Sequence, residues 1–349
     1  MLDEDPDFID SNDDENDPLQ NHEAPIIDPD DAVLQRRDDQ RFVTEMERIV
    51  DEAESVRLKY MESRRLRRFL HTIVTILCVV GGSAGFVWYL LLELNLQMAL
   101  LSILAALVIP GVIGLIKDGP VKAYKKHHKQ KFMPEMARAL GGFRYFEKRG
   151  IGTKVIKKSG VISPFKHYEA EDCFMGLYQD VKVIMSEARL YASAMKRKSV
   201  FDGLFILMEM PENIFEGHTI ITADQGLARA YADTRWKGLK HLKTPEDDPE
   251  WKRFLIYTNN VEAAEKQIDN VLFKELLETA QIFDDAPLSA VMFGKKFLFL
   301  AIPHAEDMFE ASNIFVPVTL KSYIEKCRKE LDKMMEIIDL YELYAKNRD

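Results

Sequence analysis

The sequence predicts an α+β protein in which a two-helix transmembrane hairpin precedes a mainly antiparallel sheet domain with long flanking helices. Two long apolar runs without any charged residue lie early in the chain, and short β-rich runs separated by turn residues fill much of its second half. In that half the predicted order of strands, helix, hairpin and helix is typical of an α+β fold. The 349 residues leave room for one or two domains of ordinary size.

The chain begins with an acidic segment, residues 1–35. It carries thirteen Asp or Glu and no Lys or Arg, so it more than accounts for the formal net charge of −10. Its prolines and few apolar residues cannot bury enough surface to offset the entropy of ordering, which predicts a disordered tail. The remainder is nearly neutral, and we therefore expect no nucleic-acid partner.

Residues 36–69 predict a cytoplasmic helix with a possible coiled-coil seam. Apolar residues recur at alternating spacings of four and three on an otherwise charged helix, namely Phe42, Met46, Ile49, Ala53, Val56 and Tyr60. The seam can pair with a second copy, with a partner protein, or with the predicted C-terminal helix at 317–347. An amphipathic helix packed on its own domain fits the same pattern.

Residues 70–116 predict the transmembrane hairpin. Its spans are 70–92 and 98–116, and neither contains Asp, Glu, Lys or Arg. At about 1.5 Å per helical residue they reach roughly 35 and 28 Å, enough to cross a hydrocarbon core of about 30 Å. A pair of buried helices in a soluble protein is the alternative, but such helices normally show a polar face.

Basic residues flank both spans on the same side. They are Arg64, Arg65, Arg67 and Arg68 before the first span, and Lys117, Lys122, Lys125, Lys126, Lys129 and Lys131 after the second. The loop between the spans has no positive charge, so the positive-inside rule places both termini in the cytoplasm. We expect the basic residues to set this topology and to contact anionic lipid headgroups. The adjacent His127 and His128 would point about 100° apart on a helix and could not chelate one metal ion.

Small residues in the spans indicate close helix packing. Gly81 and Gly85 form a GxxxG pattern in the first span, and Gly111 and Gly114 follow Pro110 in the second. The pattern is typical both of packing between the two helices of the hairpin and of self-association into a homo-oligomer.

Residues 117–349 predict the cytoplasmic α+β domain. Helical spacing continues from Phe132 to Phe146, and a helix opens at Asn260. The predicted strands lie at 175–181, 182–193, 200–210, 218–223, 254–258, 288–293 and 296–302. Turns are expected at 196–199 and at Gly294 and Lys295, and a long loop at 224–252.

The sequence contains no GxSxG, HExxH, Walker or GxGxxG motif, so it offers no common catalytic signature. His304, Glu306, Asp307 and Glu310 have the side chains to bind a divalent ion, yet such a cluster is far more often a solvated helix start. We therefore expect no catalytic residue, no cofactor and no metal. The alternative is a membrane-tethered enzyme, such as a hydrolase, with an unrecognised site.

Four segments carry a resemblance to a known family. They are FDGLF (201–205), HTIITAD (218–224), WKRFLIYTNNVEAAEKQID (251–269) and KKFLFLAIPHAEDMFEAS (295–312). Behind two spans, this combination resembles a bacterial membrane family known only as a domain of unknown function. FDGLF matches a family pattern FxGLF, whereas Asn260 and residues 264–266 depart from the family's acidic and arginine positions.

The resemblance implies a location in the bacterial inner membrane and a LemA-type membrane protein as partner. Together with the hairpin, the seam and the acidic tail, it leads us to expect a membrane-anchored interaction or scaffold protein.

Overall fold

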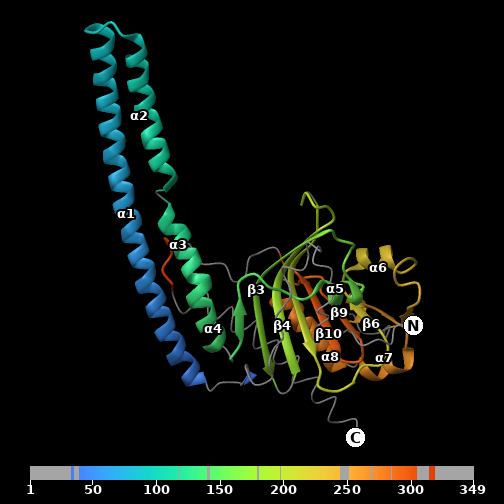
Figure 1. Ribbon diagram of the computed structural model, residues 1–349. Coiled ribbons are helices and arrows are strands. Elements are labelled where there is room, and N and C mark those ends of the chain that lie inside the picture. Colours follow the sequence, from blue (N-terminus) through green and yellow to red (C-terminus); the bar gives the residue numbers. More distant parts are fainter. Residues whose placement is uncertain are drawn as a thin grey trace, which may run out of the picture. The chain divides into compact units, whose positions relative to one another are not determined.

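The structure is a computed structural model that describes residues 33–34, 39–116, 118–139, 142–178, 181–196, 198–243, 251–268, 270–283, 285–304 and 314–318 (Figure 1). The chain divides into a helical unit, residues 44–133 with 311–320, and a sheet unit that holds the remaining residues. The predicted acidic tail lies outside the described residues, apart from Val33–Leu34. So does the predicted helix 317–347, apart from Pro317 and Val318, which are not helical.

The helical unit consists mainly of a two-helix hairpin. Helix α1, Asp39–Leu91, is a single 53-residue helix that joins the predicted seam helix to the first apolar run. It contains no proline, which is the residue that most often breaks a helix. Helix α2, Leu96–Ile116, returns alongside it after a short turn (Figure 1). In that turn Asn95 Oδ1 accepts a hydrogen bond of 3.1 Å from the backbone N–H of Met98, which caps α2.

Three short helical segments follow α2. They are α3, Gly119–His127, a π-helical turn η2, His128–Phe132, and α4, Met133–Ala139. Pro120 lies in the first turn of α3, where a missing N–H costs nothing. The predicted helical run up to Phe146 is wrong at its end, because Arg144–Phe146 forms strand β2. This strand pairs antiparallel with β3, a contact that local spacing does not reveal.

The sheet unit holds one ten-stranded sheet in the described part of the chain. Nine strands follow the order β1-β3-β4-β5-β10-β9-β6-β8-β7, and β2 pairs with β3 outside this path. Their bounds are β1 Val33–Leu34, β3 His167–Tyr178, β4 Val181–Tyr191, β5 Ser199–Glu209, β6 Thr219–Thr222, β7 Lys240–Leu242, β8 Leu255–Thr258, β9 Ser289–Phe293 and β10 Phe297–Pro303. All neighbours run antiparallel except β1 and β3, so the predicted mainly antiparallel sheet is confirmed.

Residues with positive φ angles shape the sheet, at the two predicted turns and at a bulge that was not predicted. Residues 294–296 join β9 to β10 in a three-residue hairpin loop, in which Gly294 and Lys295 have φ angles of 56° and 64°. Lys196 adopts a φ of 53° between β4 and β5. Asp172 has a φ of 51° at a bulge of β3, between Glu171 and Phe174.

Helices cover the sheet. They are α5 Thr153–Ser159, α6 Gln225–Tyr231, α7 Val261–Gln267 and α8 Asn270–Ile282, and a single 3₁₀ turn, η3, spans Trp251–Arg253. Asn260 caps α7 as expected, because its Oδ1 accepts from the N–H of Ala263 at 3.2 Å. The expected single helix after Asn260 is two helices, α7 and α8. The predicted loop 224–252 is also wrong, since it contains α6 and β7.

The core lies on both faces of the central strands. Phe297, Phe299 and Ala301 of β10 pack on one face in a cluster that also contains Val155 and Ile156 of α5. The alternate residues of β10, Leu298, Leu300 and Ile302, are buried as well and point to the opposite face. Strands β9 and β10 therefore read as continuous apolar runs, which is why their positions could be predicted.

Candidate membrane-binding site

The two helices of the hairpin pack through small residues. A Cβ on Gly82 would lie 2.4 Å from Cβ of Ala106, and one on Gly85 would lie 3.2 Å from Cβ of Ser102. Both glycines thus bring the backbone of α1 close to α2, and the Ser102 hydroxyl lies 3.4 Å from the Gly82 carbonyl oxygen.

The predicted glycines divide into two groups at this contact. Gly85 and Gly114 lie at it, the latter next to Nε2 of His71 at 3.3 Å. Gly81 and Gly111 have open space where a Cβ would stand. The GxxxG spacing predicted Gly81 and Gly85 at the helix contact, whereas Gly82 and Gly85 are the glycines of α1 that pack against α2.

The outer surface of the hairpin is apolar. Side chains from both helices are more than a third exposed, among them Ile73, Ile76, Leu77, Val79, Val80, Val87, Leu100, Leu101, Leu104, Leu107, Val108, Ile109 and Val112. Both helices are long and apolar enough to cross a membrane. An extended exposed apolar surface marks a contact with a membrane or with another protein.

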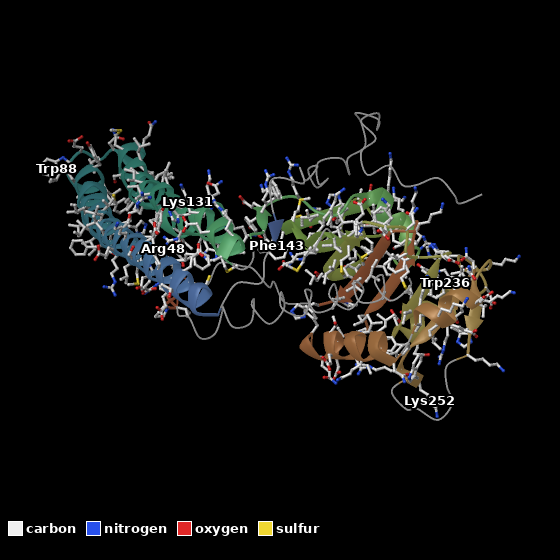
Figure 2. The ribbon with its side chains drawn as sticks, turned by 90° about the horizontal axis from the view of Figure 1, so that it is seen from below. Arg48, Trp88, Lys131, Phe143, Trp236 and Lys252 are labelled. Atoms are coloured by element: carbon white, nitrogen blue, oxygen red, sulfur yellow. The ribbon has the colours of Figure 1, made fainter. Side chains whose placement is uncertain are left out.

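The basic residues lie at the end of the hairpin opposite its turn. Figure 2 shows Trp88 beside the turn, with Arg48 and Lys131 far from it. Arg65, Arg67, Arg68, Lys122, Lys125, Lys126 and Lys131 are exposed, whereas Arg64 and Lys129 are partly buried. Lys117 lies outside the described residues. Arg64 donates to Oδ1 of Asp118 at 3.2 Å, and this ion pair joins α1 to the start of α3.

The lysine-rich stretch 122–131 has a buried face as well as a charged one. Tyr124, His128 and Phe132 are buried, and the ring of Tyr60 on α1 lies 6.1 Å from that of Tyr124. The imidazole of His128 stacks on Phe132 with 4.5 Å between ring centroids. Burial, with smaller contributions from Lys129 and His127, lowers the pKa of His128 from 6.5 to about 4. The histidine is therefore a neutral packing residue.

A segment from far along the sequence belongs to the helical unit. The sequence indicated a possible pairing of the seam with residues 317–347, but not the attachment at Ile314. Residues 314–318, drawn in red beside α1 in Figure 1, are held at both ends. Arg57 donates to the carbonyl oxygen of Ile314 at 2.6 Å, and the N–H of Val318 donates to Oε2 of Glu54 at 2.9 Å.

Glu54 and Arg57 also pair with each other one turn apart on α1. The Arg57 Nε and one terminal nitrogen donate to the two carboxylate oxygens at 2.7 and 2.5 Å. The hydrogen bonds from Arg57, with a smaller one from Val318, hold the pKa of Glu54 below its usual value. Arg57 is only 4% exposed, whereas the Glu54 side chain is 28% exposed, so the guanidinium is withdrawn from solvent and the carboxylate only in part.

Between its two anchors the 314–318 segment presents apolar side chains outward. Ile314 and Val318 are buried, whereas Phe315 and Val316 are 54% and 53% exposed. The guanidinium of Arg64 lies 4.6 Å from the centre of the Phe315 ring, a cation–π contact.

The sheet unit offers a weaker set of candidate groups. His304 follows β10 and its ring lies 5.8 Å from that of Phe283, while Glu306, Asp307 and Glu310 lie outside the described residues. Within the described ranges, no group of three His, Cys, Asp or Glu side chains could hold a metal ion. The only other large apolar side chain exposed beyond the hairpin and the 314–318 segment, among described residues, is Met195 in the β4–β5 turn.

Residues 199–343 match the model of a family described as a protein of unknown function, DUF3137. This confirms the expected resemblance to a domain of unknown function. The match begins at β5 and does not include the hairpin. No curated protein and no solved structure matches the chain.

The DUF3137 match includes FDGLF, and the structure gives its glycine a physical role. Gly203 has a φ of 155°, and a Cβ there would lie 2.2 Å from the carbonyl oxygen of Ile302 on β10. Only glycine lets β5 approach β10 this closely, so this position serves the fold.

Proposed function

We propose that this chain is a membrane-anchored interaction protein. The hairpin of α1 and α2 spans a bacterial inner membrane, and both termini and the sheet unit lie in the cytoplasm. The observation that carries the proposal is the hairpin's exposed apolar surface, which is bounded at one end by exposed arginines and lysines. Apolar side chains gain free energy in the hydrocarbon core, and basic side chains stay near anionic headgroups.

The long N-terminal part of α1 supports an interaction role over a simple anchor. A span needs about 20 residues, whereas α1 has 53 and continues well beyond the apolar run. Met46 and Ile49 of the predicted seam are already buried within the chain, which leaves the charged faces of this part exposed. A partner protein is expected to bind these charged faces or the sheet unit, and the family resemblance implies a LemA-type membrane protein.

Cysteine labelling tests the topology. Leu94→Cys places a thiol in the turn, where the native side chain is 84% exposed, and Met195→Cys places one in the sheet unit at a site that is 69% exposed. In intact bacterial spheroplasts that express the full chain, a membrane-impermeant maleimide should label Leu94→Cys. It should label Met195→Cys only after permeabilisation. The unsubstituted chain reports the background from the native cysteines.

Two results contradict the proposal. If neither cysteine reacts before permeabilisation, the hairpin does not cross the membrane. If Met195→Cys alone reacts in intact spheroplasts, the topology is reversed and the sheet unit is not cytoplasmic. Crosslinking in native membranes then tests the interaction role. A reproducible protein partner supports it, and recovery of the chain alone contradicts it.

A further inference from the structure

The 314–318 segment stands out because α1 holds its two ends while its middle stays exposed. Arg57 and Glu54 bind the backbone of Ile314 and Val318, whose side chains turn inward. Phe315 and Val316 between them are more than half exposed. Fixing the backbone this way keeps much of both apolar side chains exposed, and burying that exposed area in another surface would gain free energy.

The position of the segment along α1 indicates what that surface is. Arg64, which contacts the Phe315 ring, precedes the first apolar residue of the predicted span, Leu70, by six residues. At about 1.5 Å per residue this is about 9 Å along the helix axis. The headgroup layer beside the hydrocarbon core is about 5–8 Å thick, so Phe315 lies close to its level.

The chemistry of the neighbourhood agrees with a headgroup layer. Leu66 and Phe69 of α1 are 59% and 62% exposed and carry the apolar surface of the hairpin down toward Arg64. Arg65, Arg67 and Arg68 are exposed among them and attract anionic lipids. Apolar side chains such as Trp, Phe and Leu bury about 5–10 Å deep at the boundary between headgroups and acyl chains.

We propose that Phe315 and Val316 form a second membrane contact, which inserts into the headgroup layer of the bilayer that the hairpin crosses. The partner of this surface is the lipid itself. Arg64 holds the Phe315 ring at the correct depth, and the Glu54–Arg57 pair ties the segment to α1. This inference rests on the proposed insertion of the hairpin, so both must be measured in the same preparation.

Tryptophan quenching makes that measurement. The full chain is reconstituted into vesicles of neutral and anionic lipids whose acyl chains are brominated near the headgroup. Quenching of Trp88 reports insertion of the hairpin, and it is obtained as the difference in fluorescence quenching between the unsubstituted chain and Trp88→Phe. In the Trp88→Phe background, where the remaining Trp236 and Trp251 are buried, Phe315→Trp reports the proposed contact.

Leu58→Trp is the matched control, since Leu58 is 41% exposed on α1 and lies twelve residues before Leu70, about 18 Å along the helix. We expect the tryptophan at 315 to be quenched at least roughly twofold more than the one at 58. If Trp88 is quenched but position 315 behaves as position 58 does, the second contact is wrong and the anchored hairpin stands. If Trp88 is not quenched, the hairpin is not inserted and both proposals fall.

Discussion

Arg57 donates a hydrogen bond of 2.6 Å to the carbonyl oxygen of Ile314, which lies 257 residues further along the chain. The same guanidinium pairs with Glu54 through two further hydrogen bonds. A single nearly buried side chain thus joins the first helix of the protein to a segment that follows the last described strand.

Replacing Arg57 should release the 314–318 segment. Arg57→Met leaves the half-withdrawn carboxylate of Glu54 without its main partner and the Ile314 carbonyl without its donor. We expect a loss of about 2 kcal/mol, which corresponds to roughly 30-fold faster hydrogen exchange at the Val318 amide. Mass spectrometry of exchange in the reconstituted chain measures this.

Arg48→Met is the control for that experiment. Arg48 pairs with Glu52 at 3.2 Å on the same helix, but both side chains are about 60% exposed. Such a pair contributes little to stability, so exchange at 314–318 should not change. Equal effects of the two substitutions would contradict the structural role of Arg57.

Gly82 and Gly81 are neighbours on α1, but only Gly82 faces a residue of α2. Substitutions at the two positions therefore form a matched pair of variants. Gly82→Ala introduces a Cβ 2.4 Å from Ala106 Cβ and should lower the stability of the hairpin by about 1–3 kcal/mol. Gly81→Ala meets open space and should be neutral or slightly stabilising, because alanine favours helix. Thermal denaturation of the two variants in the same detergent measures the difference. A Gly81→Ala variant that is the less stable of the two would show that the GxxxG face forms the packing contact.

Acidification should weaken the packing around His128. The unfolded imidazole takes up a proton near pH 6.5, whereas the buried ring resists protonation until about pH 4. The neutral imidazole therefore contributes fully to the free energy of unfolding above about pH 6.5, and this contribution is lost as the pH falls through 4. The loss is at most about 3 kcal/mol. Melting temperatures from pH 7 to pH 4 should fall more steeply for the native chain than for His128→Phe.

His127→Phe serves as the comparison, because its ring is only partly buried beside the same cluster. That variant should keep most of the pH dependence of the native chain, because burial lowers the pKa of His128 more than His127 does. A flat difference between the native chain and His128→Phe over this range would show that His128 is not the titrating group.

Gly203 should be intolerant of any side chain. Gly203→Ala places a Cβ 2.2 Å from the Ile302 carbonyl oxygen in a backbone conformation that alanine rarely adopts. We expect a loss of about 2–4 kcal/mol and separation of β5 from β10. Hydrogen exchange at β10 amides reports this, and Gly238→Ala, which meets nothing within 4 Å, should leave it unchanged. A stable Gly203→Ala variant would contradict the close approach of β5 to β10.

The strands and the two apolar helices could be predicted because their signals are local. The apolar runs of β9 and β10 and the Gly294–Lys295 turn lie within a few residues of each other. β2, α5, α6 and β7 were missed because their short sequences carry weak propensity and depend on neighbours, as Arg144–Phe146 depends on β3.

The part of the candidate site that has a local sequence signal could also be predicted. The charged flanks of the apolar runs are visible in the sequence, whereas the choice between Gly81 and Gly82 depends on how α1 is rotated against α2. The attachment of Ile314 to Arg57 joins residues too far apart for any periodicity to reveal.

The continuity of α1 has a mechanical consequence. The residues from Thr44 to Phe69 contain neither proline nor glycine, so this part of α1 is a stiff rod that extends about 39 Å beyond the apolar run. A change of roughly 10° in the tilt of the hairpin would swing the far end of this lever by about 7 Å. Bilayer thickness alters the tilt of apolar helices, so under the proposed insertion, thinning or thickening of the membrane would displace the Met46 end.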